Sequence, residues 1–132
     1  MPTTTTEGRN WIAERVLLGN TSEDLIVTVG TGSPSSGELG SPISSSTSVW
    51  GEDNNISIST NSNYTGRIDI SIEYTGGSQR VSAGTTVTEV ALRGGVPGTE
   101  STYSNIYIES LSGVDFPSGV TKAIEFTVTI DN

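Results

Sequence analysis

Two segments of strictly alternating polarity constrain the fold of this chain more than any other feature. Along Arg67–Tyr74 and Ala123–Asp131, every second residue is apolar and its neighbours are mostly polar. The apolar members are Ile68, Ile70, Ile72, Tyr74, Ile124, Phe126, Val128 and Ile130. A period of two is that of a β-strand with one buried face, because successive side chains point to opposite sides of a strand.

Four further segments have strand character, and turn residues punctuate the chain around them. They are Leu25–Val29, Ile56–Ile58, Thr86–Leu92 and Ser104–Leu111. No helical segments separate these strands, so parallel crossovers are excluded. We therefore predict a mainly β fold, a single antiparallel β-sandwich, jelly-roll-like, of about 6–8 strands. The whole chain, residues 1–132, is expected to form one domain, since domains of about 100–150 residues are the commonest.

The N-terminal residues have a different pattern. Thr4 and Glu7 have the spacing of a helix capping box, and Gly19-Asn20 supplies a stop signal. Between them lies an apolar stripe at helical spacing, formed by Trp11, Ile12, Val16 and Leu18. We predict one short helix over about residues 6–18. Residues 1–20 would then be a polar lead and helix, and residues 21–132 the sandwich.

Residues 30–48 form a longer loop than a compact domain usually contains. The loop is rich in Gly, Ser and Pro, and its only large apolar residues are Leu39 and Ile43. It begins with Gly30-Thr31-Gly32, but neither a helix nor a lysine follows, as a phosphate-binding loop would require. We expect these two glycines to form a turn that needs positive φ.

The residue inventory argues against catalysis and cofactor binding. The chain has no His and no Cys, so it lacks the commonest general base and the commonest transition-metal ligands. Glu52-Asp53 could offer oxygens to calcium, but the alternating acids of an EF-hand loop are missing, and a solvated turn is the better interpretation. We expect a protein that is not an enzyme, with no catalytic residues, no cofactor and no metal.

The charge excludes two classes of partner. The chain has fifteen acidic and six basic residues, which gives a net charge of −9, and Lys122 is the single lysine. Such a chain is repelled by phosphate backbones and anionic lipids, so we expect no nucleic-acid and no membrane partner. Acidity with so little lysine favours a halophilic source. We see no signal peptide, and no apolar run approaches the ~20 residues of a membrane-spanning helix.

The order of four motifs resembles a known group of proteins. A short helix with Asn10–Ala13 precedes Val29–Gly32, a Ser/Pro-rich loop leads to Leu39, and a later strand carries Val87–Leu92. This order resembles small virion proteins of tailed viruses, namely the N-terminal attachment domains of tail-collar fibres and related tail, baseplate and capsid-vertex components. In that group a Val-Gly-Thr-Gly turn, a loop with a leucine and a Glu-Ile-Gly-Leu strand recur in the same order. Here Ala91 replaces the usual glycine.

The resemblance implies assembly rather than catalysis. It implies a virion structural protein, either a tail or baseplate subunit or a capsid turret or decoration subunit, which is assembled in the host cytoplasm. Its partners would be copies of itself, as a trimer or higher homo-oligomer, and other virion proteins, with the host cell surface as a further candidate. Because no fibre shaft follows Asn132, we expect a stand-alone building block. With the acidic composition, the host would be a halophilic archaeon.

The assembly contact is expected on the N-terminal helix and the long loop. The candidate interface residues are Trp11, Ile12, Val16, Leu18, Leu39 and Ile43. The alternative is that helix and loop only cap one open end of the sandwich.

A second function remains open, that of an extracellular cell-surface or carbohydrate-binding β-sandwich module. Its aromatic platform would have to come from Trp50 with Tyr64, Tyr74, Tyr103 or Tyr107.

Overall fold

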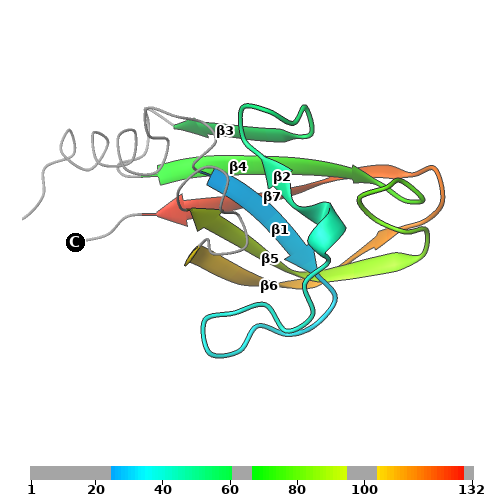
Figure 1. Ribbon diagram of the computed structural model, residues 1–132, viewed down its shortest axis with the longest axis horizontal. Helices are drawn as coiled ribbons and strands as arrows, with labels where there is room; N and C mark the ends of the chain where they lie inside the picture. Colours follow the sequence, from blue (N-terminus) through cyan, green and yellow to red (C-terminus); the bar gives the residue numbers. More distant parts are fainter. Residues whose placement is uncertain (1–24, 61–66, 95–103, 130–132) are drawn as a thin grey trace, which may run out of the picture.

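The computed structural model describes residues 25–60, 67–94 and 104–129, which form two antiparallel β-sheets (Figure 1). The strands of these residues are β1 (Leu25–Gly30), β2 (Ser48–Val49), β3 (Ile56–Thr60), β4 (Arg67–Thr75), β5 (Thr85–Gly94), β6 (Ser104–Phe116) and β7 (Thr121–Thr129). One sheet has the order β2-β1-β5-β6 and the other β3-β4-β7. The predicted antiparallel β-sandwich is confirmed. The predicted helix at residues 6–18 lies outside the described residues.

The alternating segments form the strands expected of them. β4 and β7 pair over nine consecutive positions without a bulge, from Arg67 opposite Thr129 to Thr75 opposite Thr121. In β4, Ile68, Ile70 and Ile72 are at most 1% exposed, whereas the polar residues between them are partly exposed. One face of this sheet therefore packs against the other sheet, and its opposite face is polar.

The structure lengthens most of the predicted strands, β6 the most, and adds one strand. β2 was not predicted, because its two residues carry no periodicity. β6 continues past Leu111 to Phe116, since Gly113, with a φ of 114°, accommodates a register shift against β5 between Val87 and Glu89. Gly can adopt such a φ without a steric cost.

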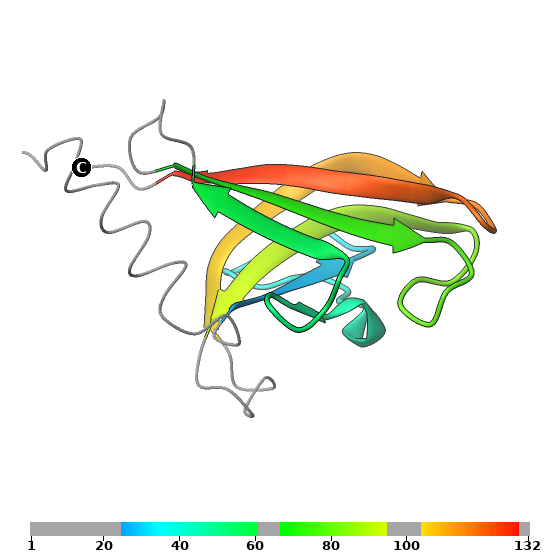
Figure 2. The same ribbon diagram turned by 90° about the horizontal axis from the view of Figure 1, so that it is seen from above.

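Aromatic pairs join the two sheets through the core. Phe116 of β6 is fully buried and packs edge-on against Tyr74 of β4, with ring centroids 6.0 Å apart. Tyr107 of β6 stacks on Phe126 of β7 at 5.9 Å. Figure 2 shows how the long β6 strand runs from one end of the sandwich to the hairpin with β7. No helix within the described ranges is long and apolar enough to cross a membrane.

The central strand β1 is buried on both faces. Val27 and Val29 belong to the core, whereas Ile26 and Thr28 alternate with them and point to the outer side of the sheet, yet they are at most 3% exposed. On that outer side, Thr28 is hydrogen-bonded to Thr47 by its hydroxyl at 3.0 Å. The segment between β1 and β2 thus folds back over the outer face of its own sheet, and the 3-10 helix η3 (Ser44–Ser46) lies on the side of β1 away from β4 and β7 (Figure 2).

Candidate functional site: a loop clamped to the outer sheet face

A buried carboxylate holds the first half of the long loop. Glu89 of β5 is 0% exposed, and its side chain accepts three backbone N–H groups of the loop. Its Oε1 accepts from Gly40 at 2.7 Å, and its Oε2 accepts from Gly32 at 3.0 Å and from Ser41 at 2.8 Å. An unpaired buried carboxylate would be very costly, and charge-assisted bonds to N–H groups offset that cost. Glu89 therefore holds loop residues that lie about fifty positions before it in the sequence.

Gly30 and Gly32 are required for space and not for positive φ. A β-carbon on Gly30 would lie 2.2 Å from Glu89 Oε2, and one on Gly32 would lie 2.8 Å from the Ser41 nitrogen. Neither Gly30 nor Gly32 has a positive φ. The sequence-based expectation of a positive-φ turn at these residues is therefore wrong. The physical reason for glycine here is the close approach of two backbone segments around one carboxylate.

The tip of the loop is a tight hairpin turn. Ser35 and Glu38 exchange two backbone hydrogen bonds, of 2.9 and 3.0 Å, around Ser36 and Gly37. Both central residues have positive φ, 53° and 77°, as two-residue hairpins of type I′ require. The amide Nδ2 of Asn105 in β6 donates to the Gly37 carbonyl at 2.8 Å. The loop is thus fixed at its base by Glu89 and at its tip by Asn105.

A serine hydroxyl holds the segment that follows the hairpin. Ser46 is 0% exposed, and its Oγ accepts the Val29 N–H at 3.0 Å and donates to the Ile43 carbonyl at 2.6 Å. The Ile43 N–H in turn donates to the Val29 carbonyl at 2.9 Å. These bonds place Ile43 against the hydrophobic core of its own chain.

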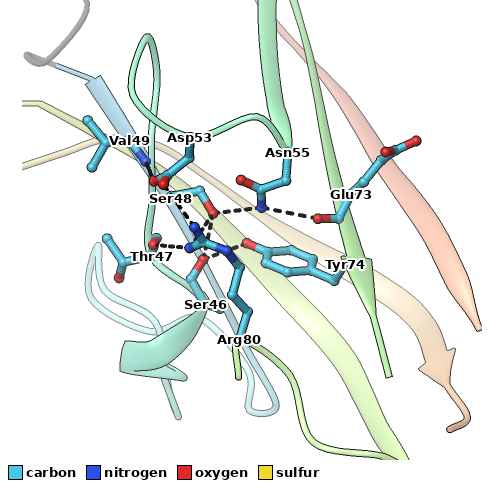
Figure 3. Close-up of polar contacts among 9 residues, drawn as sticks. All are labelled: Ser46, Thr47, Ser48, Val49, Asp53, Asn55, Glu73, Tyr74 and Arg80. Carbon is cyan, nitrogen blue, oxygen red and sulfur yellow. Dashed lines mark hydrogen bonds and ion pairs between the residues drawn. The ribbon is translucent and has the colours of Figure 1, made fainter. Parts of the chain in front are cut away.

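A second charged side chain, Arg80, holds the end of the loop (Figure 3). Its Nη1 donates to the Thr47 carbonyl at 2.8 Å and to Ser48 Oγ at 3.2 Å, and its Nη2 pairs with Asp53 Oδ1 at 2.9 Å. The other carboxylate oxygen of Asp53 accepts the Val49 N–H at 2.6 Å. The stretch around Glu52-Asp53 is a turn, as expected, and within it Asp53 is half-buried, with both of its oxygens bound to groups of the protein.

The same cluster links the β2 end of one sheet to Asn55, before β3, and to β4 of the other sheet (Figure 3). Asn55 Nδ2 donates to Ser48 Oγ at 2.9 Å and to the Glu73 carbonyl at 3.1 Å. The Tyr74 hydroxyl donates to the Ser46 carbonyl at 2.9 Å. Burial raises the pKa of Tyr74 well above its ordinary value, and the neighbouring Ser48, Ser46 and Arg80 offset only part of that rise. The phenol is therefore a stable neutral donor.

The predicted interface residues fall into three groups. Leu39 lies on the loop hairpin and is partly exposed. Ile43 is partly buried and packs on the core. Trp11, Ile12, Val16 and Leu18 lie outside the described residues.

Sequence reasoning missed the two charged residues that hold the loop, Glu89 and Arg80. The signal for Glu89 was an acid within the apolar run Val87–Leu92. Arg80 offered a weaker signal, as a lone cation between turn residues.

The aromatic residues of the alternative carbohydrate platform are largely used within the body of the protein. Trp50 packs on the core, Tyr74 is 2% exposed, and Tyr107 stacks on Phe126. Tyr64 and Tyr103 lie outside the described residues. Within the described ranges, no group of three or more acidic side chains is placed to hold a metal ion.

No protein-family model matches this chain, and no curated protein matches it significantly. The structure nevertheless shows how its motifs are related in space. Val29–Gly32 leads into the loop, Leu39 precedes the Gly40 that donates to Glu89, and Glu89 lies within Val87–Leu92. Three segments separated in sequence therefore form one structural unit.

Proposed function

We propose that this chain is a non-enzymatic structural subunit of a tailed-virus particle, which assembles into a symmetric homo-oligomer in the tail or baseplate or as a capsid turret or decoration protein. The observation that carries the proposal is the unit around Glu89. The segments that resemble tail-collar fibre attachment domains, Val29–Gly32, Leu39 and Val87–Leu92, are held together by its carboxylate. These three segments therefore serve one structural purpose, which is to present a loop of fixed conformation.

The rigidity of the loop supports a role in assembly. Binding is weakened by the entropy lost when loops and side chains become ordered, so a preorganised surface binds more tightly for the same contacts. Here Glu89, Asn105 and Arg80 already fix the loop at its base, its tip and its end. Loops held on a rigid scaffold are also where proteins usually place their binding residues.

The buried and half-buried charges of the site favour a structural role over catalysis. Both oxygens of Glu89 accept backbone N–H groups, and both oxygens of Asp53 are bound by protein groups. Arg80 donates to a backbone carbonyl and to a carboxylate. Each of these side chains stabilises the conformation of the loop, so none is directed at a substrate.

Light scattering of the purified chain in molar KCl tests the proposal. We expect a particle mass that is a multiple of 13.8 kDa and, by electron microscopy, a closed symmetric assembly. A strict monomer at high concentration, which also fails to bind any purified virion protein of its source, would contradict the proposal. Binding of the monomer to a glycan array would favour the cell-surface or carbohydrate-binding module instead.

A further inference from the structure

An exposed apolar side chain lies beside the clamped loop, on the edge strand β6. Ile106 is 43% exposed, and Val120, in the connection between β6 and β7, is 38% exposed. Among the described residues these are the large apolar side chains that solvent reaches most. We call the surface around Ile106 the β6 corner. It consists of Gly37, Glu38, Leu39, Arg93, Asn105, Ile106 and Ile108.

Hydrogen bonds and the strand register bring the residues of the β6 corner together. Asn105 holds the tip of the loop at Gly37, and Arg93 lies opposite Asn105 in the β5–β6 pair. Further along the same pair, Ala91 lies opposite Ile108 and Glu89 lies opposite Ser110. Glu89 of β5 holds Gly40, so the short segment from Gly37 to Gly40 runs from Asn105 of β6 towards Glu89 of β5. Leu39 is part of that segment, on the same face of the sheet as Ile108.

A β-bulge accounts for the exposure of Ile106. The register shifts by one residue between Leu92, which lies opposite Tyr107, and Arg93, which lies opposite Asn105. Ile106 is the extra residue and has no partner position on β5. A bulge in an edge strand hinders the addition of a further strand and redirects a side chain. The β6 corner is therefore suited to contact through side chains rather than through the strand edge.

The charge of the β6 corner is balanced, unlike that of the whole chain. The β6 corner contains one acid, Glu38, and one base, Arg93, whereas the whole chain has a net charge of −9. The two charges of the β6 corner sum to zero, so two copies that approach through it are not driven apart by these residues. Around a two-fold axis, opposite charges on one surface are also self-complementary.

We propose that the β6 corner is the surface through which this chain binds a second copy of itself. The proposal rests on the proposed function, since it names the contact by which the homo-oligomer forms. Ile106 and the partly exposed Ile108 and Leu39 supply the apolar centre, and the fixed loop tip supplies the rim. The contact requires no rearrangement, because Asn105 and Glu89 already hold the loop in place.

Two matched variants, Ile106→Gln and Val120→Gln, test this surface by light scattering over a concentration series in molar KCl. Both substitutions replace an exposed apolar side chain by a neutral polar one, so the fold and the net charge are retained. We expect Ile106→Gln to raise the concentration needed for assembly at least tenfold, and Val120→Gln to leave it unchanged. Circular dichroism verifies that both variants are folded.

The possible outcomes separate this inference from the proposed function. If the native chain assembles and Ile106→Gln assembles equally well, the β6 corner is not the interface and only this inference fails. If the native chain is a monomer at every concentration, this inference fails, and if that monomer also binds no purified virion protein of its source, the proposed function fails with it. As a second measurement, the amides of Gly37, Leu39 and Ile108 should exchange hydrogen more slowly in the assembled chain than after dilution. Unchanged exchange at these residues would also overturn the inference.

Discussion

The carboxylate of Glu89 fills the space that a side chain at Gly30 would occupy. A β-carbon on Gly30 would lie 2.2 Å from Glu89 Oε2 and 2.6 Å from the Ser41 carbonyl oxygen. Gly30 is the last residue of β1, paired with Glu89 itself across the sheet. The pair therefore sets where the strand ends and how closely the loop returns over it.

Replacement of Gly30 by Ala should destabilise the protein by about 1–3 kcal/mol, because the added methyl group forces the carboxylate or the loop to move. The measurement is the urea midpoint, with hydrogen exchange at Gly32, Gly40 and Ser41 as a local readout. Gly84→Ala is the control. It adds the same methyl group in open space at a φ of 84°, so it strains the backbone without touching the loop. Equal rates of hydrogen exchange at the loop amides in both variants would contradict the role given to Gly30.

Replacement of Glu89 by Gln tests the carboxylate itself. The amide keeps the shape of the side chain, but its NH₂ group would face backbone N–H donors, and the charge that strengthens these bonds is lost. We expect a loss of about 1–3 kcal/mol in unfolding free energy, with faster exchange of the loop amides. Glu73→Gln, on the exposed face of β4, should change stability by no more than about 0.5 kcal/mol. A similar, small effect of both variants would show that Glu89 does not hold the loop.

The strands of this protein could be predicted because their signal is local. The alternation in Arg67–Tyr74 reports directly which side chains are buried, and the structure buries Ile68, Ile70, Ile72 and Tyr74. β2 and the end of β6 were missed, since the first depends on pairing with β1 and the second on a register shift near Gly113.

The site could not be predicted in the same way, because its contacts join distant parts of the chain. Forty-nine residues separate Glu89 from Gly40. From sequence alone, an acid in a strand indicates a solvated face, and a glycine pair indicates a turn. Only the fold shows that Gly30 leaves room for the acid and that Gly32 leaves room for the returning loop at Ser41.

Replacement of Arg80 by Lys should destabilise the protein by about 1–2 kcal/mol. The guanidinium is planar and rigid, so its two terminal nitrogens bind the Thr47 carbonyl and Asp53 at the same time. An ammonium group is a single point charge and cannot reproduce this arrangement. Arg67→Lys is the matched control, since Arg67 pairs with Asp69 at the same 2.9 Å with similar exposure. Exposed pairs of this kind contribute about 0–1 kcal/mol. Chemical denaturation of both variants measures their unfolding free energies. Equal losses of stability in the two would contradict a special role for Arg80.

Salt should raise the melting temperature of the native chain. At a net charge of −9 the folded state experiences self-repulsion, which salt screens because the Debye length shrinks to about 3 Å at 1 M. Thermal unfolding in a KCl series from low to molar concentration measures the effect, and sorbitol at matched osmolarity serves as the control for general solute effects. A melting temperature that stays constant or falls with KCl would contradict the halophilic interpretation.

Alkaline pH should destabilise the protein through Tyr74. Burial raises the pKa of this phenol in the folded chain, whereas in the unfolded chain it ionises near its ordinary pKa of about 10. Above that pH the unfolded state releases a proton that the folded state retains, so stability is complete below about pH 10 and is lost as the pH rises towards the folded-state pKa. Urea midpoints between about pH 8 and pH 11 should therefore fall.

Tyr74→Phe isolates this effect from the other tyrosines. Burial also raises the pKa of Tyr107, with a contribution from Glu109, but Tyr107 is present in both proteins. At neutral pH the variant should be less stable by about 1 kcal/mol, since it loses the bond to the Ser46 carbonyl. Above about pH 10 its stability should fall less steeply than that of the native chain, so the two curves converge. Parallel curves would show that the Tyr74 phenol ionises alike in both states, and that burial does not hold it neutral.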